Sequence, residues 1–247
     1  MSEYKVPRVS TGVQGLDEML GGGVPEQGII LLCGGPGAGK TIMSMQYMMN
    51  AVKNGEPTLY VSLEEPMEAK AQNALAFGWD IRDAMKKGLV EVMDVYMVPQ
   101  SQGYVDPYDR MRGKIQTTIE DEIDRIASKM EAKHIIIDPL TSILVHEQRS
   151  GKKRYIIGQI FDTIRKLGCS ALITSEGLPS ESDFYMEEFL ADGVILLVKD
   201  IINYKLIKTL RIDKMRGIDF DDQPRRYVVS GKGFQVFNNE QVLSKGA

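Results

Sequence analysis

Cysteine and long apolar runs are scarce in this chain of 247 residues. Its two cysteines, Cys33 and Cys169, lie within apolar segments and form no Cys-x-x-Cys pair, so packing explains them better than metal or redox chemistry. The longest apolar runs, such as residues 194–198, are far shorter than the roughly 20 residues that a membrane-spanning helix needs. The first residues, MSEYKVPRVS, contain no apolar signal core. We therefore expect a soluble, cytoplasmic protein without a membrane partner.

An excess of basic residues is also missing. Lysine and arginine number 30 against 34 aspartates and glutamates, which gives a net charge of -4 and a pI near 5.4. A dedicated binder of duplex DNA usually has a basic surface overall, so that class is disfavoured, although a local basic groove stays possible. The sequence contains no internal repeat and no low-complexity linker. We expect one domain over residues 1–247, with a core at about 9–237 and short extensions at both ends.

Hydrophobic patterns typical of strands and helices alternate over most of the chain. Strands are expected at residues 28–33, 57–63, 89–95, 134–138 and 170–174, and helices at 41–54, 66–77, 108–132 and 155–167. Strand segments that are apolar on both faces are typical of a parallel sheet covered by helices on both sides. After Ala191, turns alone separate the strand patterns 194–198, 205–213, 226–230 and 234–237, which predicts antiparallel hairpins. The expected fold class is therefore α/β: a mainly parallel central sheet flanked by helices on both faces, with antiparallel hairpins at the C-terminal end.

The segment Gly34–Thr41, GGPGAGKT, matches the phosphate-binding motif G-x-x-x-x-G-K-[ST]. Glycines adopt backbone angles that are closed to other residues, so consecutive N–H groups can point at phosphate oxygens, and the following helix adds its positive end. Lys40 would bridge the β- and γ-phosphates, and the Thr41 hydroxyl would bind Mg²⁺. The alternative is a glycine-rich turn that binds nothing, but the match lies between a predicted strand and a predicted helix, as the motif requires. The residues expected to bind the nucleotide are Gly35, Pro36, Gly37, Ala38, Gly39, Lys40 and Thr41.

Carboxylates follow two further strand segments. Asp138 comes directly after Ile135–Ile137 and is expected to hold a water molecule on Mg²⁺. Glu64 and Glu65 end the strand after the phosphate-binding helix, on the side of a parallel sheet that faces the ligand crevice. Neighbouring side chains on an extended backbone point in different directions, so one of the two glutamates should approach the γ-phosphate as the catalytic base, and we favour Glu64. The alternative for both is a solvated helix N-terminus that begins at Pro66.

Six segments of the chain form a series of motifs: VSTGVQGLDEMLGGGVPEQGIILLCGGPGAGKT, YVSLEEP, HIIIDPLTSI, ALITSEG, MEEFLADGVILL and DKMRG. This series, which runs from about Val9 to Phe237, resembles the KaiC-like branch of the RecA superfamily of ATPases, in particular its single-domain archaeal proteins. The resemblance implies a RecA-like P-loop fold and a slow ATPase with ATP and Mg²⁺ as cofactors. It also implies a homo-oligomer, a hexameric ring or a filament, with ATP between neighbouring subunits.

The resemblance assigns further residues. In KaiC-like proteins the K-x-R-G segment is presented to the nucleotide of the adjacent subunit, which implies that Lys214 and Arg216 stabilise transition-state charge as an arginine finger does. The alternative is a solvated basic edge strand. Glu176 stands where RecA-type recombinases tend to carry a glutamine that senses the γ-phosphate, which disfavours a recombinase. The chain departs from KaiC itself in having room for one ATPase domain, so no autokinase activity is inferred, and in lacking the Thr-x-His that often follows Gly217.

Two functions stay open. In the first, a regulatory ATPase changes its packing with nucleotide state, and an unidentified partner protein responds. In the second, a recombinase-like paralogue binds single-stranded DNA in recombination or repair. Residues 146–155 are expected to form a loop with four cationic side chains and an aromatic one, which in RecA-type assemblies faces the central axis; the alternative is a solvated loop. The next loop is acidic and would repel phosphates, so we favour the regulatory ATPase; its carboxylates are Glu176, Glu181, Asp183, Glu187 and Glu188.

Overall fold

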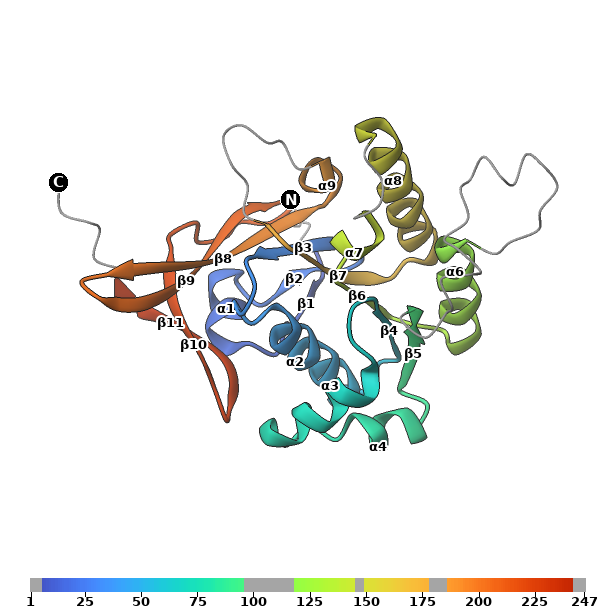
Figure 1. Cartoon of the computed structure of the whole chain (residues 1–247), viewed down its shortest axis with the longest axis horizontal. Coiled ribbons are helices and arrows are strands. Elements are labelled where there is room, and N and C mark those ends of the chain that lie inside the picture. The colour runs from blue at the N-terminus through green and yellow to red at the C-terminus, as the bar shows by residue number, and fades with distance from the viewer. Residues whose placement is uncertain (1–5, 96–117, 145–148, 178–185, 242–247) are drawn as a thin grey trace, which may run out of the picture.

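One nine-stranded sheet forms the centre of the protein (Figure 1). The computed structural model describes residues 6–95, 118–144, 149–177 and 186–241. The strand order is β11-β10-β9-β8-β3-β7-β6-β4-β5. The strands are β3 (Ile29–Gly34), β4 (Thr58–Ser62), β5 (Val90–Asp94), β6 (His134–Asp138), β7 (Ser170–Ser175), β8 (Gly193–Ile202), β9 (Lys205–Met215), β10 (Arg225–Ser230) and β11 (Gly233–Gln241).

Parallel pairing covers most of this sheet. The strands from β8 through β3, β7, β6 and β4 to β5 are parallel to one another. Beyond β8, the strands β9, β10 and β11 are added in antiparallel pairs. The α/β class predicted from the sequence, with antiparallel strands at the C-terminal end, is confirmed. A second, two-stranded sheet pairs β1 (Arg8–Val9) with β2 (Val24–Pro25) on either side of α1 (Gln14–Met19).

Helices cover both faces of the sheet (Figure 1). One face carries α2 (Lys40–Lys53), α3 (Met67–Ala74) with the 3-10 turn Leu75–Phe77, and α4 (Ile81–Lys86). The other face carries α6 (Ile119–Met130) and α8 (Ser150–Leu167). The described residues also form the short helices α7 (Thr141–Leu144) and α9 (Met186–Leu190). None of the helices in the described part of the chain is long and apolar enough to cross a membrane.

Strand β3 contributes to two separate cores. Ile30 and Leu32 pack with the helices of the first face, whereas Ile29, Leu31 and Cys33 pack with those of the second. Because successive side chains of a strand point to opposite faces, a strand that is apolar throughout serves both cores. Cys33 is therefore part of the hydrophobic core, and burial raises the pKa of its thiol far above the ordinary value.

Helix α6 begins at Ile119 and not near Tyr108. Thr118 and Asp121 form a capping box, in which Thr118 Oγ1 accepts from the Asp121 N–H at 3.3 Å and Asp121 Oδ2 accepts from the Thr118 N–H at 3.2 Å. Such a box satisfies N–H groups that have no partner within the helix and so defines its first turn. The prediction of one continuous helix over 108–132 is therefore wrong at Thr118, whose backbone is extended; residues 108–117 lie outside the described residues.

Helix α8 begins at Ser150, five residues earlier than predicted. Gly151–Arg154, expected in a loop, form part of its first turns, and residues 146–148 lie outside the described residues. The apolar face of α8 starts at Ile156, and lysine and arginine are good helix formers, so the helix extends past the apolar stripe. The prediction of a basic loop is wrong for residues 150–154.

Candidate active site

Four neighbouring strands end at one edge of the sheet with a glycine or a polar residue. Gly34 ends β3, Ser62 ends β4, Asp138 ends β6 and Ser175 ends β7. These strands are adjacent in the order β3-β7-β6-β4, so their ends lie side by side. The carboxyl edge of a parallel sheet is the usual ligand-binding edge of α/β folds.

A glycine-rich loop joins β3 to α2 at this edge. Gly37 and Gly39 have φ angles of 70° and 104°, which side-chain-bearing residues rarely adopt. Lys40 is buried at the start of α2; its Nζ atom donates to the Gly34 carbonyl oxygen at 2.7 Å and lies 3.9 Å from Glu176 Oε1. The loop thus closes around an ammonium group at a helix N-terminus, an arrangement that binds phosphate.

Two residues from β8 and β10 hold the outer side of this loop. The buried Tyr227 hydroxyl donates to the Ala38 carbonyl oxygen at 2.7 Å. The Lys199 ammonium group donates to the Pro36 carbonyl oxygen. The antiparallel strands therefore support the loop conformation, a role that the sequence patterns did not indicate.

Asp138 accepts several hydrogen bonds inside the site. Its Oδ1 atom accepts from Thr174 Oγ1 at 2.7 Å and lies 3.4 Å from Thr41 Oγ1. Its Oδ2 atom accepts from the Tyr60 hydroxyl at 2.7 Å and from the Lys70 ammonium group at 2.8 Å. Burial by itself would raise the pKa of Asp138, but the Lys70 charge and the hydrogen bonds that Asp138 accepts outweigh it and hold the pKa below its usual value. Asp138 is therefore ionised at neutral pH.

The pair Thr41 and Asp138 fits a magnesium ion that binds together with a nucleotide. Their hydroxyl and carboxylate oxygens are adjacent, and Mg²⁺ prefers oxygen ligands, with substrate phosphates and water completing its coordination. In the described part of the chain, no cluster of three His, Cys, Asp or Glu side chains could hold a metal ion on its own. The residues present therefore suit a metal ion that arrives with phosphate groups.

The charge of Glu64 interacts with that of Lys40 in the glycine-rich loop. Burial raises the pKa of Glu64, and the charge of Glu176 raises it further, while Lys40 acts in the opposite direction. The carboxylate of Glu64 thus lies within electrostatic range of the loop lysine. Glu65 contacts the site through its backbone, since its carbonyl oxygen accepts from the Ser62 hydroxyl at 2.6 Å. The charges of Asp138 and Lys40 both act on Glu64, as expected of an acid near the carboxyl edge of the sheet.

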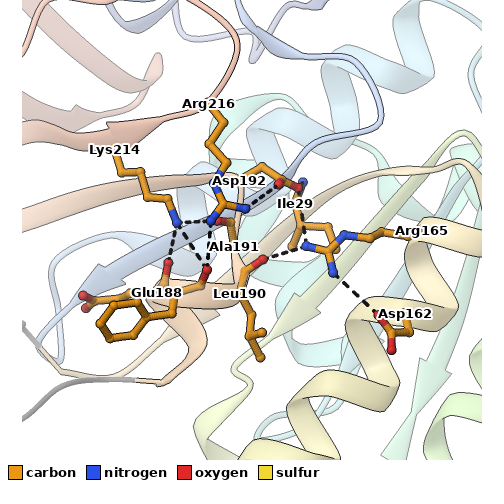
Figure 2. A network of polar contacts seen from close by, with 10 residues as sticks. Ile29, Asp162, Arg165, Glu188, Leu190, Ala191, Asp192, Lys214 and Arg216 are labelled. Atoms are coloured by element: carbon orange, nitrogen blue, oxygen red, sulfur yellow. Dashed lines mark hydrogen bonds and ion pairs between the residues drawn. The ribbon is translucent and has the colours of Figure 1, made fainter.

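Lys214 and Arg216 bind the C-terminal end of α9 (Figure 2). Lys214 Nζ donates to the carbonyl oxygens of Glu188 and Ala191 at 2.8 and 2.7 Å, and Arg216 Nη1 lies 3.4 Å from Asp192 Oδ1. Cations complement the unpaired carbonyl groups at a helix C-terminus. Burial and the neighbouring Arg216 charge lower the pKa of Lys214. Lys214 is partly buried, so the predicted alternative of a solvated basic strand is wrong for this residue, whereas Arg216 is exposed as that alternative expects.

Comparison with known families accounts for nearly the whole chain. A family model described as the KaiC ATPase matches residues 9–241. The chain belongs to the KaiC family of ATPases. This membership confirms the resemblance seen in the sequence and supports a P-loop protein that binds ATP.

Known relatives of this KaiC-type chain match it over nearly its whole length. A UPF0273 protein of Pyrococcus horikoshii is 33% identical over 244 residues, with 97% of each chain covered. A UPF0273 protein of Thermotoga maritima is 32% identical, with 95% of this chain and 98% of the relative covered. The circadian clock oscillator protein KaiC of Acaryochloris marina is 25% identical over 96% of this chain but only 45% of its own length. A solved KaiC-like protein of Pyrococcus horikoshii has a TM-score of 0.80 and 28% identity, covering 94% of this chain and 99% of its own.

The acidic segment of this KaiC-type chain is not a uniformly solvated loop. Glu176 is directed at Lys40, and Glu187 is buried and accepts from the Ser175 hydroxyl at 3.2 Å. The predicted placement of Glu187 in a phosphate-repelling loop is therefore wrong, because Glu187 belongs to α9 and its carboxylate is buried against the end of β7. Two other members of the predicted acidic loop lie outside the described residues: Glu181 and Asp183.

Three residues that contact Asp138 were not singled out from the sequence: Tyr60, Lys70 and Thr174. Tyr60 and Thr174 belong to apolar strand segments in which one polar group carries no motif signal. Lys70 lies in the amphipathic helix α3, where a lysine is ordinarily read as a surface residue. A pattern within one element cannot identify these residues, since each contact joins two elements.

Proposed function

We propose that this KaiC-type chain is a regulatory ATPase that hydrolyses ATP slowly with Mg²⁺ in an assembly of identical subunits. The observation that carries the proposal is the convergence of Lys40, Thr41 and Asp138 at one sheet edge, with Glu64 in electrostatic range. A phosphate-binding cation, two oxygen ligands and an acid with a raised pKa are the groups that ATP hydrolysis requires. A cytoplasmic location and a protein partner that responds to nucleotide state belong to the same proposal.

Each residue has a task in the proposed reaction. Lys40 exchanges the Gly34 carbonyl oxygen for phosphate oxygens, which are stronger partners for an ammonium group. Thr41 and Asp138 hold Mg²⁺, which when bound supplies the positive charge that stabilises phosphoryl transfer. Glu64 accepts the proton of the attacking water, and Glu65 is the second candidate for that task.

The positions of Lys214 and Arg216 support a nucleotide shared between subunits. The Arg216 N–H donates to the Asp192 carbonyl oxygen and the Asp192 N–H to the Ile29 carbonyl oxygen, both at 2.8 Å, so Arg216 lies level with the start of β3. The glycine-rich loop follows the other end of this six-residue strand, roughly 16 Å away at about 3.3 Å per residue. An arginine side chain does not span that distance, so a finger role for Arg216 needs the nucleotide of another subunit. Such head-to-tail contacts build rings or filaments.

Hydrolysis measured across a protein concentration series tests the proposal. Specific activity should require Mg²⁺, rise with assembly followed by light scattering in the same samples, and fall to background in Lys40→Ala. It should also be lost in Arg216→Ala at concentrations where that variant still assembles. A specific activity in Lys40→Ala equal to that of the wild type would refute the ATPase site. Constant specific activity from monomer upward would refute only the shared site.

Single-stranded DNA is the less favoured ligand. The cationic residues expected to track it lie in the first turns of α8, where the positive end of the helix dipole adds to their attraction for phosphate. The carboxylates Glu176 and Glu188 of the following acidic segment would oppose that attraction, because they repel phosphates. DNA added to the same assay decides the question. Stimulation that falls steeply with salt and disappears in a Lys153→Ala, Arg154→Ala double variant would replace the regulatory role with a DNA-linked one.

A further inference from the structure

A lysine is buried beside the candidate metal site. Lys70, on α3, is 3% exposed. Its Nζ atom lies 2.8 Å from Asp138 Oδ2, 2.9 Å from Ser62 Oγ and 5.0 Å from the centre of the Tyr60 ring. Lysine is almost never so buried unless it is paired. Here the partner is the acid that the proposed function assigns to magnesium.

The hydrogen bonds of Asp138 leave little acceptor capacity. A carboxylate has about four acceptor positions. Short bonds from Thr174, Tyr60 and Lys70 occupy three of them. The fourth direction is the one toward Thr41, at 3.4 Å. Lys70 therefore helps to hold the carboxylate in the orientation that presents Oδ1 to the start of α2.

The charge of Asp138 is already compensated without any metal ion. Lys70 and Asp138 form a buried ion pair, and a second positive charge drawn to the same carboxylate is repelled by the ammonium group. Stability alone is a poor reason for such a pair, because buried ion pairs often stabilise a fold no better than well-packed apolar residues. Its location at the ligand-binding edge of the sheet indicates a role in the site.

We propose that Lys70 is a positioning residue that serves as the resident cation of the magnesium site. It orients Asp138 before the nucleotide binds, and it competes with Mg²⁺ for the charge of that carboxylate. The charge of Asp138 is thereby compensated before the nucleotide binds, and Asp138 binds Mg²⁺ less tightly than an unpaired aspartate would. This inference rests on the proposed function, since it concerns the metal ion that accompanies the nucleotide.

Magnesium titrations of nucleotide binding test the inference without measuring turnover. A fluorescent methylanthraniloyl derivative of ATP serves as the probe, and the Mg²⁺ concentration at half-maximal binding is measured for the wild type, Lys70→Gln and Lys70→Met. We expect this concentration to fall about three- to tenfold in both variants, because the competing charge is gone. The variants without ligand should unfold at a lower temperature than the wild type, and Mg²⁺ with ATP should restore more of their stability.

Tyr60→Phe is the matched control, since it removes a hydrogen bond to the same Asp138 oxygen without changing charge. It should shift the Mg²⁺ midpoint less than about twofold. A midpoint in Lys70→Gln that equals or exceeds that of the wild type overturns the inference. Wild-type protein that binds no nucleotide at any Mg²⁺ concentration would instead overturn the proposed function.

Circular dichroism is used before each titration to check that the variants are folded. A variant that is folded only with Mg²⁺ and nucleotide supports the resident-cation role, because the metal ion then supplies the missing charge. If both variants remain unfolded under all conditions, the ion pair is a requirement of the fold and the inference is overturned.

Discussion

At the scale of single residues, the candidate site combines acids with opposite pKa shifts. The pKa of Asp138 lies below its usual value, because the Lys70 charge and the hydrogen bonds it accepts outweigh burial. The pKa of Glu64 is raised, first by burial and then by the charges of Glu176 and Asp138. Two acids whose pKa values are pushed apart are typical of different tasks in one reaction. An ionised Asp138 suits metal binding, and a more basic Glu64 suits proton transfer.

Glu64→Gln should lower kcat for ATP hydrolysis by about 10²- to 10⁴-fold, the usual contribution of a general base. Glu65→Gln makes the same chemical change one residue further along the chain and should lower kcat by less than about tenfold. Steady-state assays at saturating Mg²⁺ and ATP measure both, with nucleotide binding checked separately. A larger loss in Glu65→Gln would assign the base to Glu65.

Glu176→Gln should move the acidic limb of the pH–rate profile to lower pH. The Glu176 charge contributes to the raised pKa of Glu64, so its removal lowers that pKa and keeps Glu64 ionised in more acidic solution. The position of the limb is the pH at which kcat falls to half of its maximum, so a change in the maximal kcat does not affect it. Glu68→Gln, which removes an exposed acid paired with Arg82, is the control and should leave the limb in place. A limb that stays in place in Glu176→Gln, or moves to higher pH, would contradict the coupling.

At the scale of elements, a buried histidine joins the helix after the glycine-rich loop to the strand that ends in Asp138. His134, the first residue of β6, has Nδ1 at 2.9 Å from the Tyr47 hydroxyl of α2 and Nε2 at 2.9 Å from Glu56 Oε2. An ionised carboxylate only accepts, so Nε2 carries the hydrogen and Nδ1 accepts from Tyr47. Neutral imidazole therefore satisfies both partners.

The stability of the protein should fall on acidification through the ordinary histidine range. Burial lowers the pKa of His134 below its usual 6.5 and outweighs the opposite influence of Glu56. As the pH falls below 6.5, the unfolded chain gains a proton at this position that the folded chain does not, so unfolding becomes easier. Thermal melts from about pH 7 to pH 5 should show a smaller loss of Tm in His134→Gln than in the wild type. Equal losses would exclude His134 as a source of the pH dependence.

At the scale of the whole molecule, the groups proposed for catalysis lie at two opposite edges of one sheet. The glycine-rich loop and Asp138 are at the carboxyl edge, whereas Arg216 is level with Ile29 at the other. A surface that fits a different surface on the next copy makes a heterologous contact. One such contact would bring the two halves of the proposed site together.

Mixing two inactive variants should therefore restore hydrolysis. Lys40→Ala lacks the phosphate-binding lysine and Arg216→Ala lacks the finger, yet an interface between one copy of each can combine an intact loop with an intact finger. With random assembly of equal amounts, about one quarter of the interfaces are complete, so activity near one quarter of the wild type is expected. Each variant alone, at the same total concentration, is the control. Mixtures no more active than their components would argue against a site shared between subunits.

The local parts of fold and site could be predicted from the sequence. Gly34–Thr41 was assigned as a phosphate loop, and the structure places it between β3 and α2, with Gly37 and Gly39 at positive φ. The strand His134–Asp138 agrees with the prediction at both ends. Such features depend on neighbours along the chain: backbone freedom, hydrophobic period and turn chemistry act over a few residues.

The tertiary structure decided which side chains meet. Nothing near Lys70 in the sequence indicates that it lies against Asp138, and nothing near Tyr227 indicates that it holds the glycine-rich loop. Helix α8 likewise extends through a basic segment that reads as a loop. By itself the sequence determined the strand segments, the glycine-rich loop and the acid at the end of the strand 134–138, because those are local. The partners of that acid come from β4, α3 and β7, so only the packing of distant elements could bring them together.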